Sequence, residues 1–198
     1  MSIEIVEGFV SRTYEEELRD TLLSANFPWF LNQRTVPDDY PLLRVPADGT
    51  ILDTPQFTHT LHDNGGPTST FCGLVMPLLH FFTAKTGIST RQVIRIKANL
   101  TVPHPRTMGT DVYQGPHVDF QYNDGSSFVT MVYYVNDSDG DTVLFHERST
   151  GPIARLSERQ RVTPRQGRLV CFDGEIIHSG QNPRETPARA VINLNVRR

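Results

Sequence analysis

Hydrophobic and polar residues alternate in several short runs, most clearly in the second half of the chain. Between Val93 and Val102 the apolar residues share one parity, and polar or charged residues occupy the other. Successive side chains of a strand point to opposite faces, so this pattern predicts a half-buried strand. Further strands are predicted at Met1–Val10, His117–Gln121, Phe128–Asn136, Thr142–His146, Arg168–Phe172 and Ala188–Val196.

Two segments of the first half follow a helical period instead. The first is predicted to run from the capping pair Thr13 and Glu16 to about Ala25. The second is predicted to run from near Pro67 to Gly87, because proline suits a helix start and glycine the position past its end. The apolar faces consist of Tyr14, Leu18 and Leu22 in the first helix and Phe71, Leu74, Val75, Leu78 and Phe82 in the second.

Two helices followed by many short strands predict a mainly β fold with backing helices. The architecture expected is a double-stranded β-helix of the jelly roll or cupin type. At 198 residues the chain has the size of one domain. We expect a single domain in which residues 1–90 give helical and loop support and residues 91–198 form the core. Residues 34–67 follow neither period, and this long loop is either a functional segment or an ordinary surface loop. Residues 34–67 and 103–116 are the candidate lids.

Composition and charge narrow the classes of function. The net charge of -3 and the pI of about 6.1 argue against a dedicated nucleic-acid binder, which usually carries a basic face. Cys72 and Cys171 form no zinc or redox motif, so we expect buried free thiols. No signal-peptide pattern and no apolar run near the roughly 18 residues of a membrane helix is present. We therefore expect a cytoplasmic protein without nucleic-acid or membrane partners.

A candidate metal site begins at His117-Val118-Asp119. Residues two apart on a strand point to one face, so this imidazole and this carboxylate would converge. In a closed barrel, His178 could complete a cluster of three ligands. Two histidines and one carboxylate form the facial triad of non-haem Fe(II) oxygenases, which leaves positions open for a co-substrate and O₂. An isolated H-x-D is common by chance, so other features must support this interpretation.

The last predicted strand supplies such a feature, because Arg189 shares the polar parity of this strand with Asn193 and Asn195. An arginine buried in a barrel needs an anion, since an unpaired buried charge is very costly. A dicarboxylate co-substrate would supply one through a bidentate pair. The alternative is a structural salt bridge to an aspartate or glutamate.

These residues and several short motifs together resemble the 2-oxoglutarate/Fe(II)-dependent oxygenases. The resemblance covers about residues 91–196 and is strongest to the prolyl 4-hydroxylase-like branch, including its small bacterial and phage members. In order, the motifs are His117-x-Asp119, Thr130–Asn136, Gly140–Thr142, Pro164–Phe172, His178–Gly180 and Arg189.

The resemblance implies a hydroxylase that uses Fe(II), 2-oxoglutarate and O₂, with ascorbate as an accessory reductant and succinate and CO₂ as co-products. A peptide prolyl group or a small molecule is the expected substrate. The residues implied to bind iron and form the catalytic centre are His117, Asp119 and His178. Those expected at the 2-oxoglutarate site are Arg189, Tyr134, Asn99 and Thr142. Those expected to face the substrate are Tyr113 and Asn195.

Two other classes of function stay open at this point. A cupin-type metal dioxygenase without a co-substrate would need no buried arginine in its last strand. A non-catalytic jelly-roll binding module would bind no stoichiometric metal. Halogenases of the resembling family carry a small residue where this chain has Asp119, and nucleic-acid repair members carry an arginine where it has Asn195. Both of those activities are therefore disfavoured.

Overall fold

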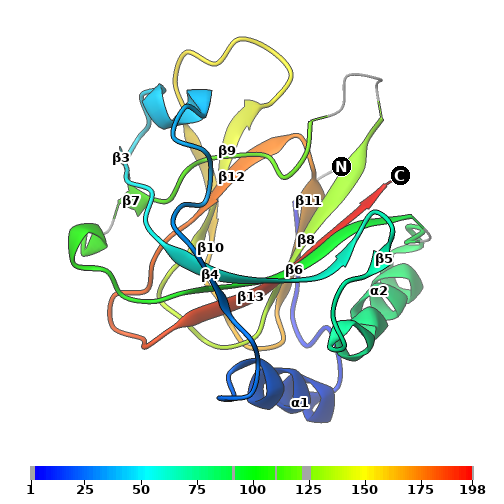
Figure 1. Ribbon diagram of the computed structural model, residues 1–198. Helices are drawn as coiled ribbons and strands as arrows, with labels where there is room; N and C mark the ends of the chain where they lie inside the picture. The colour runs from blue at the N-terminus through cyan, green and yellow to red at the C-terminus, as the bar shows by residue number, and fades with distance from the viewer. Residues whose placement is uncertain (1–2, 91, 110, 122–125, 198) are drawn as a thin grey trace.

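The computed structural model describes residues 3–90, 92–109, 111–121 and 126–197, and its largest feature is a twisted antiparallel sheet (Figure 1). Its strands are β1 (Glu4–Val6), β2 (Phe30–Asn32), β4 (Gln56–Asp63), β5 (Gly66–Pro67), β6 (Val93–Thr101), β8 (Phe128–Tyr134), β11 (Leu169–Asp173) and β13 (Arg189–Arg197). The order across the sheet is β1-β11-β8-β13-β6-β4-β2, with β5 paired to β4.

A smaller sheet lies opposite this one. Its strands, in the order β10-β9-β12, are β10 (Glu158–Val162), β9 (Thr142–Arg148) and β12 (Ile176–Gly180). A short parallel pair, β3 (Thr50–Ile51) with β7 (Val112–Tyr113), lies beside them. Side chains from both sheets meet in one core, among them Tyr134, Leu144 and Phe172. The molecule is therefore mainly β and forms the predicted double-stranded β-helix.

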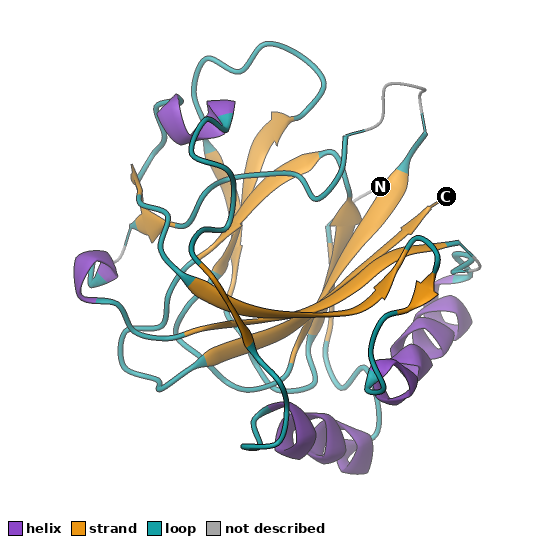
Figure 2. Ribbon diagram, viewed as in Figure 1, coloured by secondary structure: helices purple, strands orange, loops and turns teal. Residues whose placement is uncertain are grey.

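Helices α1 (Arg12–Leu22) and α2 (Cys72–Thr86) cover the outer face of the larger sheet (Figure 2). Leu18 and Leu22 of α1 pack into a core with Val75 and Phe82 of α2, which confirms the predicted apolar faces. The outward-facing side chains of the strands complete this core, including Tyr133 of β8. The polar parity of the same strands consequently faces the interior of the barrel.

The helix ends differ from the prediction at their starts. Ser11, not Thr13, caps α1, because its hydroxyl accepts a hydrogen bond from the backbone N–H of Tyr14. Helix α2 begins at Cys72, since Pro67 belongs to β5. Its end is as predicted: Gly87 has φ 72°, a left-handed conformation that glycine adopts without strain.

The strand predictions hold for the regular runs and fail elsewhere. Strands β6, β8, β9, β11 and β13 match their predicted ranges to within two residues. The loop expected over residues 34–67 instead contains β4, which extends the larger sheet beyond β6. Conversely, His117–Gln121 is not a strand: His117 forms only an isolated bridge with His178. The shorter 3₁₀ helices are η1 (Pro41–Arg44) and η2 (Pro105–Thr107).

Two compositional expectations bear on the structure. Cys72 and Cys171 are both buried thiols, as predicted. Within the described ranges, no helix is long and apolar enough to span a bilayer.

Candidate active site

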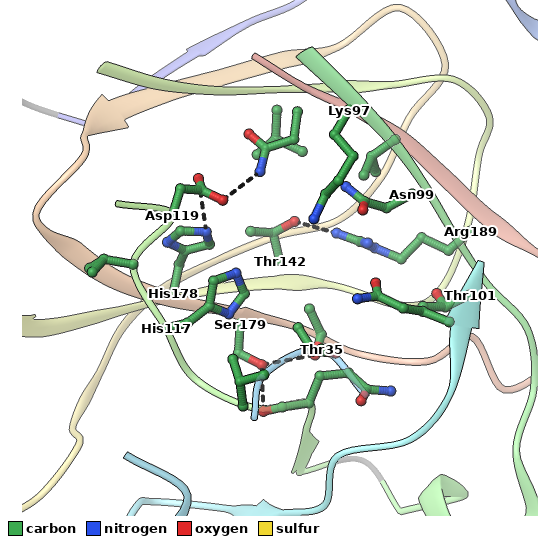
Figure 3. A pocket seen from close by; sticks show the side chains of 18 of the residues that line it. Thr35, Lys97, Asn99, Thr101, His117, Asp119, Thr142, His178, Ser179 and Arg189 are labelled. Carbon is green, nitrogen blue, oxygen red and sulfur yellow. Dashed lines mark hydrogen bonds and ion pairs between the residues drawn. The ribbon is translucent and has the colours of Figure 1, made fainter. Parts of the chain in front are cut away.

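Three metal-ligating side chains converge inside the barrel. One ligand atom from each of His117, Asp119 and His178 lies within 4.8 Å of the others (Figure 3). Reciprocal backbone hydrogen bonds of 2.9 Å, from His117 N to His178 O and from His178 N to His117 O, hold the two histidines together. The isolated bridge at His117 therefore brings the ligand side chains together, although a full strand was expected there.

Both imidazole rings are oriented by backbone carbonyls. His117 Nδ1 donates to the carbonyl oxygen of Gly115 at 2.8 Å, and His178 Nδ1 donates to that of Ile176 at 3.2 Å. Because a carbonyl only accepts, Nε2 of each ring is left as the lone-pair donor. Burial, with the charge of His178, lowers the pKa of His117 to about 4, so this ring is neutral at pH 7. Neutral imidazole is the form that binds a metal.

Asp119 is fixed by four donors. Its Oδ1 accepts from Arg95 Nη2 at 2.9 Å and from Asn193 Nδ2 at 3.0 Å. Its Oδ2 accepts from Asn195 Nδ2 at 2.9 Å and from Thr130 Oγ1 at 3.2 Å. Burial alone would raise the pKa of Asp119, but the positive groups around it outweigh burial and hold the pKa well below its usual range. The carboxylate is thus ionised and held in one orientation.

Arg189 is buried at the other side of the same cavity. Its Nε donates to the carbonyl oxygen of Gly140 and its Nη2 to Thr142 Oγ1, both at 2.7 Å. Thr142 Oγ1 also accepts from the hydroxyl of Tyr134 at 2.8 Å. No salt bridge joins Arg189 to a carboxylate anywhere in the described ranges, so the alternative of a structural salt bridge is not what this residue forms. The guanidinium remains available to an anionic ligand.

The cavity between these groups measures about 230 Å³. His117, Asp119 and His178 lie at one side and Arg189 at the other (Figure 3). Residues 35–37, from the segment expected to be a lid, line the cavity and are called the mouth segment below. The Asp53 carboxylate accepts from the backbone N–H groups of Thr35, Val36 and Gly115, at 2.8, 3.2 and 3.1 Å. One carboxylate thus ties the mouth to the segment that carries His117.

The remaining predicted site residues have different locations. Asn99 and Thr142 line the cavity. Tyr134 does not line it, and contacts Thr142 instead. Tyr113 is 1% exposed and donates to Glu158, so its expected position facing the substrate is wrong: the side chain packs in a separate core.

The expectation that Asn195 faces the substrate is also wrong. It is fully buried, and its amide donates to Asp119 and to Thr130 rather than lining the cavity. Its contacts make it a support for the carboxylate, not a residue that faces a substrate.

Sequence reasoning missed Arg95, Lys97 and Asn193. All three line the cavity, and two of them contact Asp119. The available signal was the polar parity of β6, which carries two cations beside Asn99. The pattern alone does not tell whether that face meets solvent or the barrel interior.

The donor set fits a single Fe(II). The Nε2 atoms of two imidazoles and one ionised carboxylate, each oriented by its own hydrogen bonds, aim at one region of the cavity. This combination is the 2-His-1-carboxylate facial triad, which leaves coordination positions open for exogenous ligands. Arg189, across the cavity, suits the free end of a chelating dicarboxylate. The fold and the site thus define a class: a double-stranded β-helix protein with a candidate facial-triad metal site.

Comparison with known proteins shows which family the chain resembles within this class. Residues 104–197 match the family model of the 2OG-Fe(II) oxygenase superfamily. This match covers just under half of the chain, and together with the fold and the His117, Asp119 and His178 cluster it supports an oxygenase of that superfamily, whose cofactors are Fe(II), 2-oxoglutarate and O₂. Comparison with curated protein sequences gives no significant match.

Solved structures of low identity share the fold over nearly the whole chain. A 2OG-Fe(II) oxygenase family oxidoreductase from Burkholderia pseudomallei has TM-score 0.61 and 14% identity, covering 98% of this chain and 84% of its own. A Pseudomonas putida prolyl-4-hydroxylase has TM-score 0.55 and 16% identity, covering 99% and 92%. A Trichoplax adhaerens prolyl hydroxylase, in complex with a hypoxia inducible factor peptide, has TM-score 0.60 and 13% identity, covering 98% and 83%. The fold is thus shared with prolyl hydroxylases and with other 2OG-Fe(II) oxygenases.

Proposed function

We propose that the protein is a 2-oxoglutarate-dependent hydroxylase that forms succinate and CO₂ and hydroxylates a peptide prolyl group or a small molecule. One observation carries this proposal: a three-ligand cluster and an arginine without a carboxylate partner face each other across one cavity. That arrangement suits 2-oxoglutarate, which chelates a metal with its keto-acid end and presents a second carboxylate at the other end.

Each group has a role in this proposal. His117, Asp119 and His178 hold the iron, and Arg189 binds the distal carboxylate of 2-oxoglutarate. When bound, iron and 2-oxoglutarate supply the oxidising chemistry that activates O₂ and splits the co-substrate into succinate and CO₂. Thr142 fixes the Arg189 guanidinium through a 2.7 Å hydrogen bond, so the cation is already in place before the co-substrate arrives.

The chain around the iron ligands keeps their geometry constant. Arg95 and Asn193 occupy one oxygen of Asp119, while Asn195 and Thr130 occupy the other. Such partners of a ligating carboxylate typically change metal affinity or activity by about 10–100-fold when removed. In this orientation Asp119 Oδ2 lies 3.8 Å from His178 Nε2.

The mouth of the cavity controls which substrates reach the iron. Val36, Pro37 and Tyr40 line the cavity, together with the polar Thr35 and Gln56. A cavity of about 230 Å³ lies below the usual range of about 300–1,000 Å³ for ligand pockets. A substrate must therefore insert a small group, and a prolyl ring of a peptide or a small molecule meets this requirement. The prolyl hydroxylases that share the fold support the first of these.

The test is Asp119→Ala in the Fe(II)-loaded enzyme, assayed for 2-oxoglutarate-dependent O₂ consumption and succinate formation. Loss of the carboxylate removes a ligand, so we expect turnover to disappear while circular dichroism shows the fold intact. The matched control is Asp20→Ala, an exposed aspartate on α1 whose ion pair is with the neighbouring Arg19. Wild-type turnover by the Asp119 variant would overturn the assignment.

A further inference from the structure

Lysine is rare in this chain, and one of the lysines faces the active site. Among 19 basic residues, only Lys85 and Lys97 are lysines. Lys85 is exposed in the last turn of α2. Lys97 lies on β6 and lines the cavity. Figure 3 shows its side chain extending into the space between the two histidines and Arg189.

Lys97 has no counter-ion among the described residues. It forms no hydrogen bond or ion pair with any residue that the structure describes. Of the described residues that line the cavity, Arg95, Lys97 and Arg189 are cations and Asp119 is a carboxylate. Asp119 is taken by Arg95, at 2.9 Å. Two cations, Lys97 and Arg189, are therefore left to a ligand, and 2-oxoglutarate has two carboxylates.

The strand register places these cations at different ends of the site. Lys97 pairs with Asn193 of β13, whose amide donates to Asp119, so Lys97 lies in the row of the metal ligands. Arg189 pairs with Thr101, four positions away along both strands. Four residues of strand span about 14 Å between Cα atoms. The charges that act most on Lys97 are correspondingly those of Arg95 and Asp119.

We propose that Lys97 binds the keto-acid carboxylate of 2-oxoglutarate at the iron end of the cavity, while Arg189 binds the distal carboxylate. This inference rests on the co-substrate site of the proposed function and adds a second cation to it. Burial, together with Arg95, lowers the pKa of Lys97 to about 8. An ammonium in that condition gains from a bound carboxylate, which restores the lost solvation with a charge-assisted hydrogen bond.

Two ligands and two variants separate the two ends. 2-Oxovalerate has the same keto-acid end as 2-oxoglutarate but a methyl group in place of the distal carboxylate. Binding of each ligand to the Mn(II)-loaded, anaerobic protein is measured by calorimetry, so no turnover is involved. The variants are Lys97→Met and Arg189→Met, and the control is Lys85→Met. Lys97→Arg tests whether another cation restores binding.

Lys97→Met is expected to weaken the binding of both ligands by the same factor, about 10- to 100-fold, because a hydrogen bond between charged groups is lost. Arg189→Met should weaken the binding of 2-oxoglutarate alone, and Lys85→Met should weaken the binding of neither ligand. Lys97→Arg should recover part of the affinity. Lys97→Met should lower neither the affinity for Mn(II) nor the thermal unfolding temperature, because the Lys97 side chain forms no hydrogen bond or ion pair with a described residue.

Three results would overturn the inference. If the Lys97→Met variant binds both ligands with wild-type affinity, Lys97 makes no contact with the co-substrate. Loss confined to 2-oxoglutarate would move Lys97 to the distal carboxylate. Failure of the wild type itself to bind 2-oxoglutarate would instead refute the proposed function, and the inference with it.

A second measurement needs no substitution. Reductive methylation of the wild-type protein, followed by mass spectrometry, compares the reactivity of Lys97 with that of Lys85 in the same molecule. Mn(II) with 2-oxovalerate should slow methylation of Lys97 several-fold and leave Lys85 unchanged. Equal rates with and without this ligand would contradict the contact.

Discussion

The hydroxyl of Thr142 connects Arg189, the residue proposed to bind the co-substrate, to the core of the barrel, and its removal gives a sharp test. Thr142 is 2% exposed and accepts hydrogen bonds from Arg189 Nη2 at 2.7 Å and from the Tyr134 hydroxyl at 2.8 Å. Valine has nearly the shape of threonine, so Thr142→Val leaves no cavity. It does leave both donors in a buried place without this acceptor.

The expected cost follows from those two donors. A buried polar group deprived of its partner costs about 1–3 kcal/mol. The Tyr134 hydroxyl keeps a long contact of 3.4 Å to the carbonyl oxygen of Val162, which reduces its share. Thr142→Val should therefore lower the free energy of unfolding by about 2–4 kcal/mol. The substitution should also weaken the binding of 2-oxoglutarate, because the guanidinium of Arg189 loses one of its two hydrogen-bond partners.

Urea unfolding of the metal-free protein, followed by circular dichroism, measures the first effect, and calorimetry with Mn(II) measures the second. Thr163→Val is the matched control, since Thr163 is exposed and its change should stay within about 0.5 kcal/mol. A change at Thr142 no larger than at Thr163, with unchanged 2-oxoglutarate affinity, would refute the role assigned to this hydroxyl.

Three further substitutions test the frame of the site. Although burial raises the pKa of Asp139, hydrogen bonds from Thr186 and from the backbone of residues 184–186 hold it well below its usual range. Asp139→Asn should cost about 1–3 kcal/mol, and in urea titrations the wild type should lose that advantage as pH falls below about 4, where an unfolded aspartate takes up a proton. Gly140→Ala should destabilise by about 1–3 kcal/mol in thermal unfolding, since its Cβ would lie 2.6 Å from the carbonyl oxygen of Gln181. Asp53→Asn should raise the KM for the primary substrate, measured by succinate formation, because the mouth segment loses its carboxylate acceptor; an unchanged KM would contradict that role.

Much of the fold can be predicted because the strands of the core have one apolar and one polar parity. The alternation of β6 and β13 is visible in the sequence, and both strands match their predicted ranges closely. Strand β4 was not predicted because threonine and histidine interrupt its apolar positions, although Leu61 is fully buried. Strand β10 escaped because it consists largely of charged and polar residues at a sheet edge.

The site divides in the same way. The spacing of His117 and Asp119 was enough to suggest convergence, even though the strand expected there is only a bridge. The contacts that fix Asp119 could not be derived from spacing, because Arg95 and Asn193 reach it through the register of two strands distant in sequence. The same register places Lys97 in the cavity.

The central claim, a metal site that shares one cavity with a co-substrate arginine, is tested most directly by anaerobic titration of the protein with Fe(II) and 2-oxoglutarate. We predict the visible charge-transfer band of the chelate in the wild type, and a need for about 10- to 100-fold more 2-oxoglutarate in Arg189→Ala. Bound iron without the band would contradict the co-substrate site and favour a dioxygenase that needs none. Failure to bind iron at all would contradict the metal centre itself.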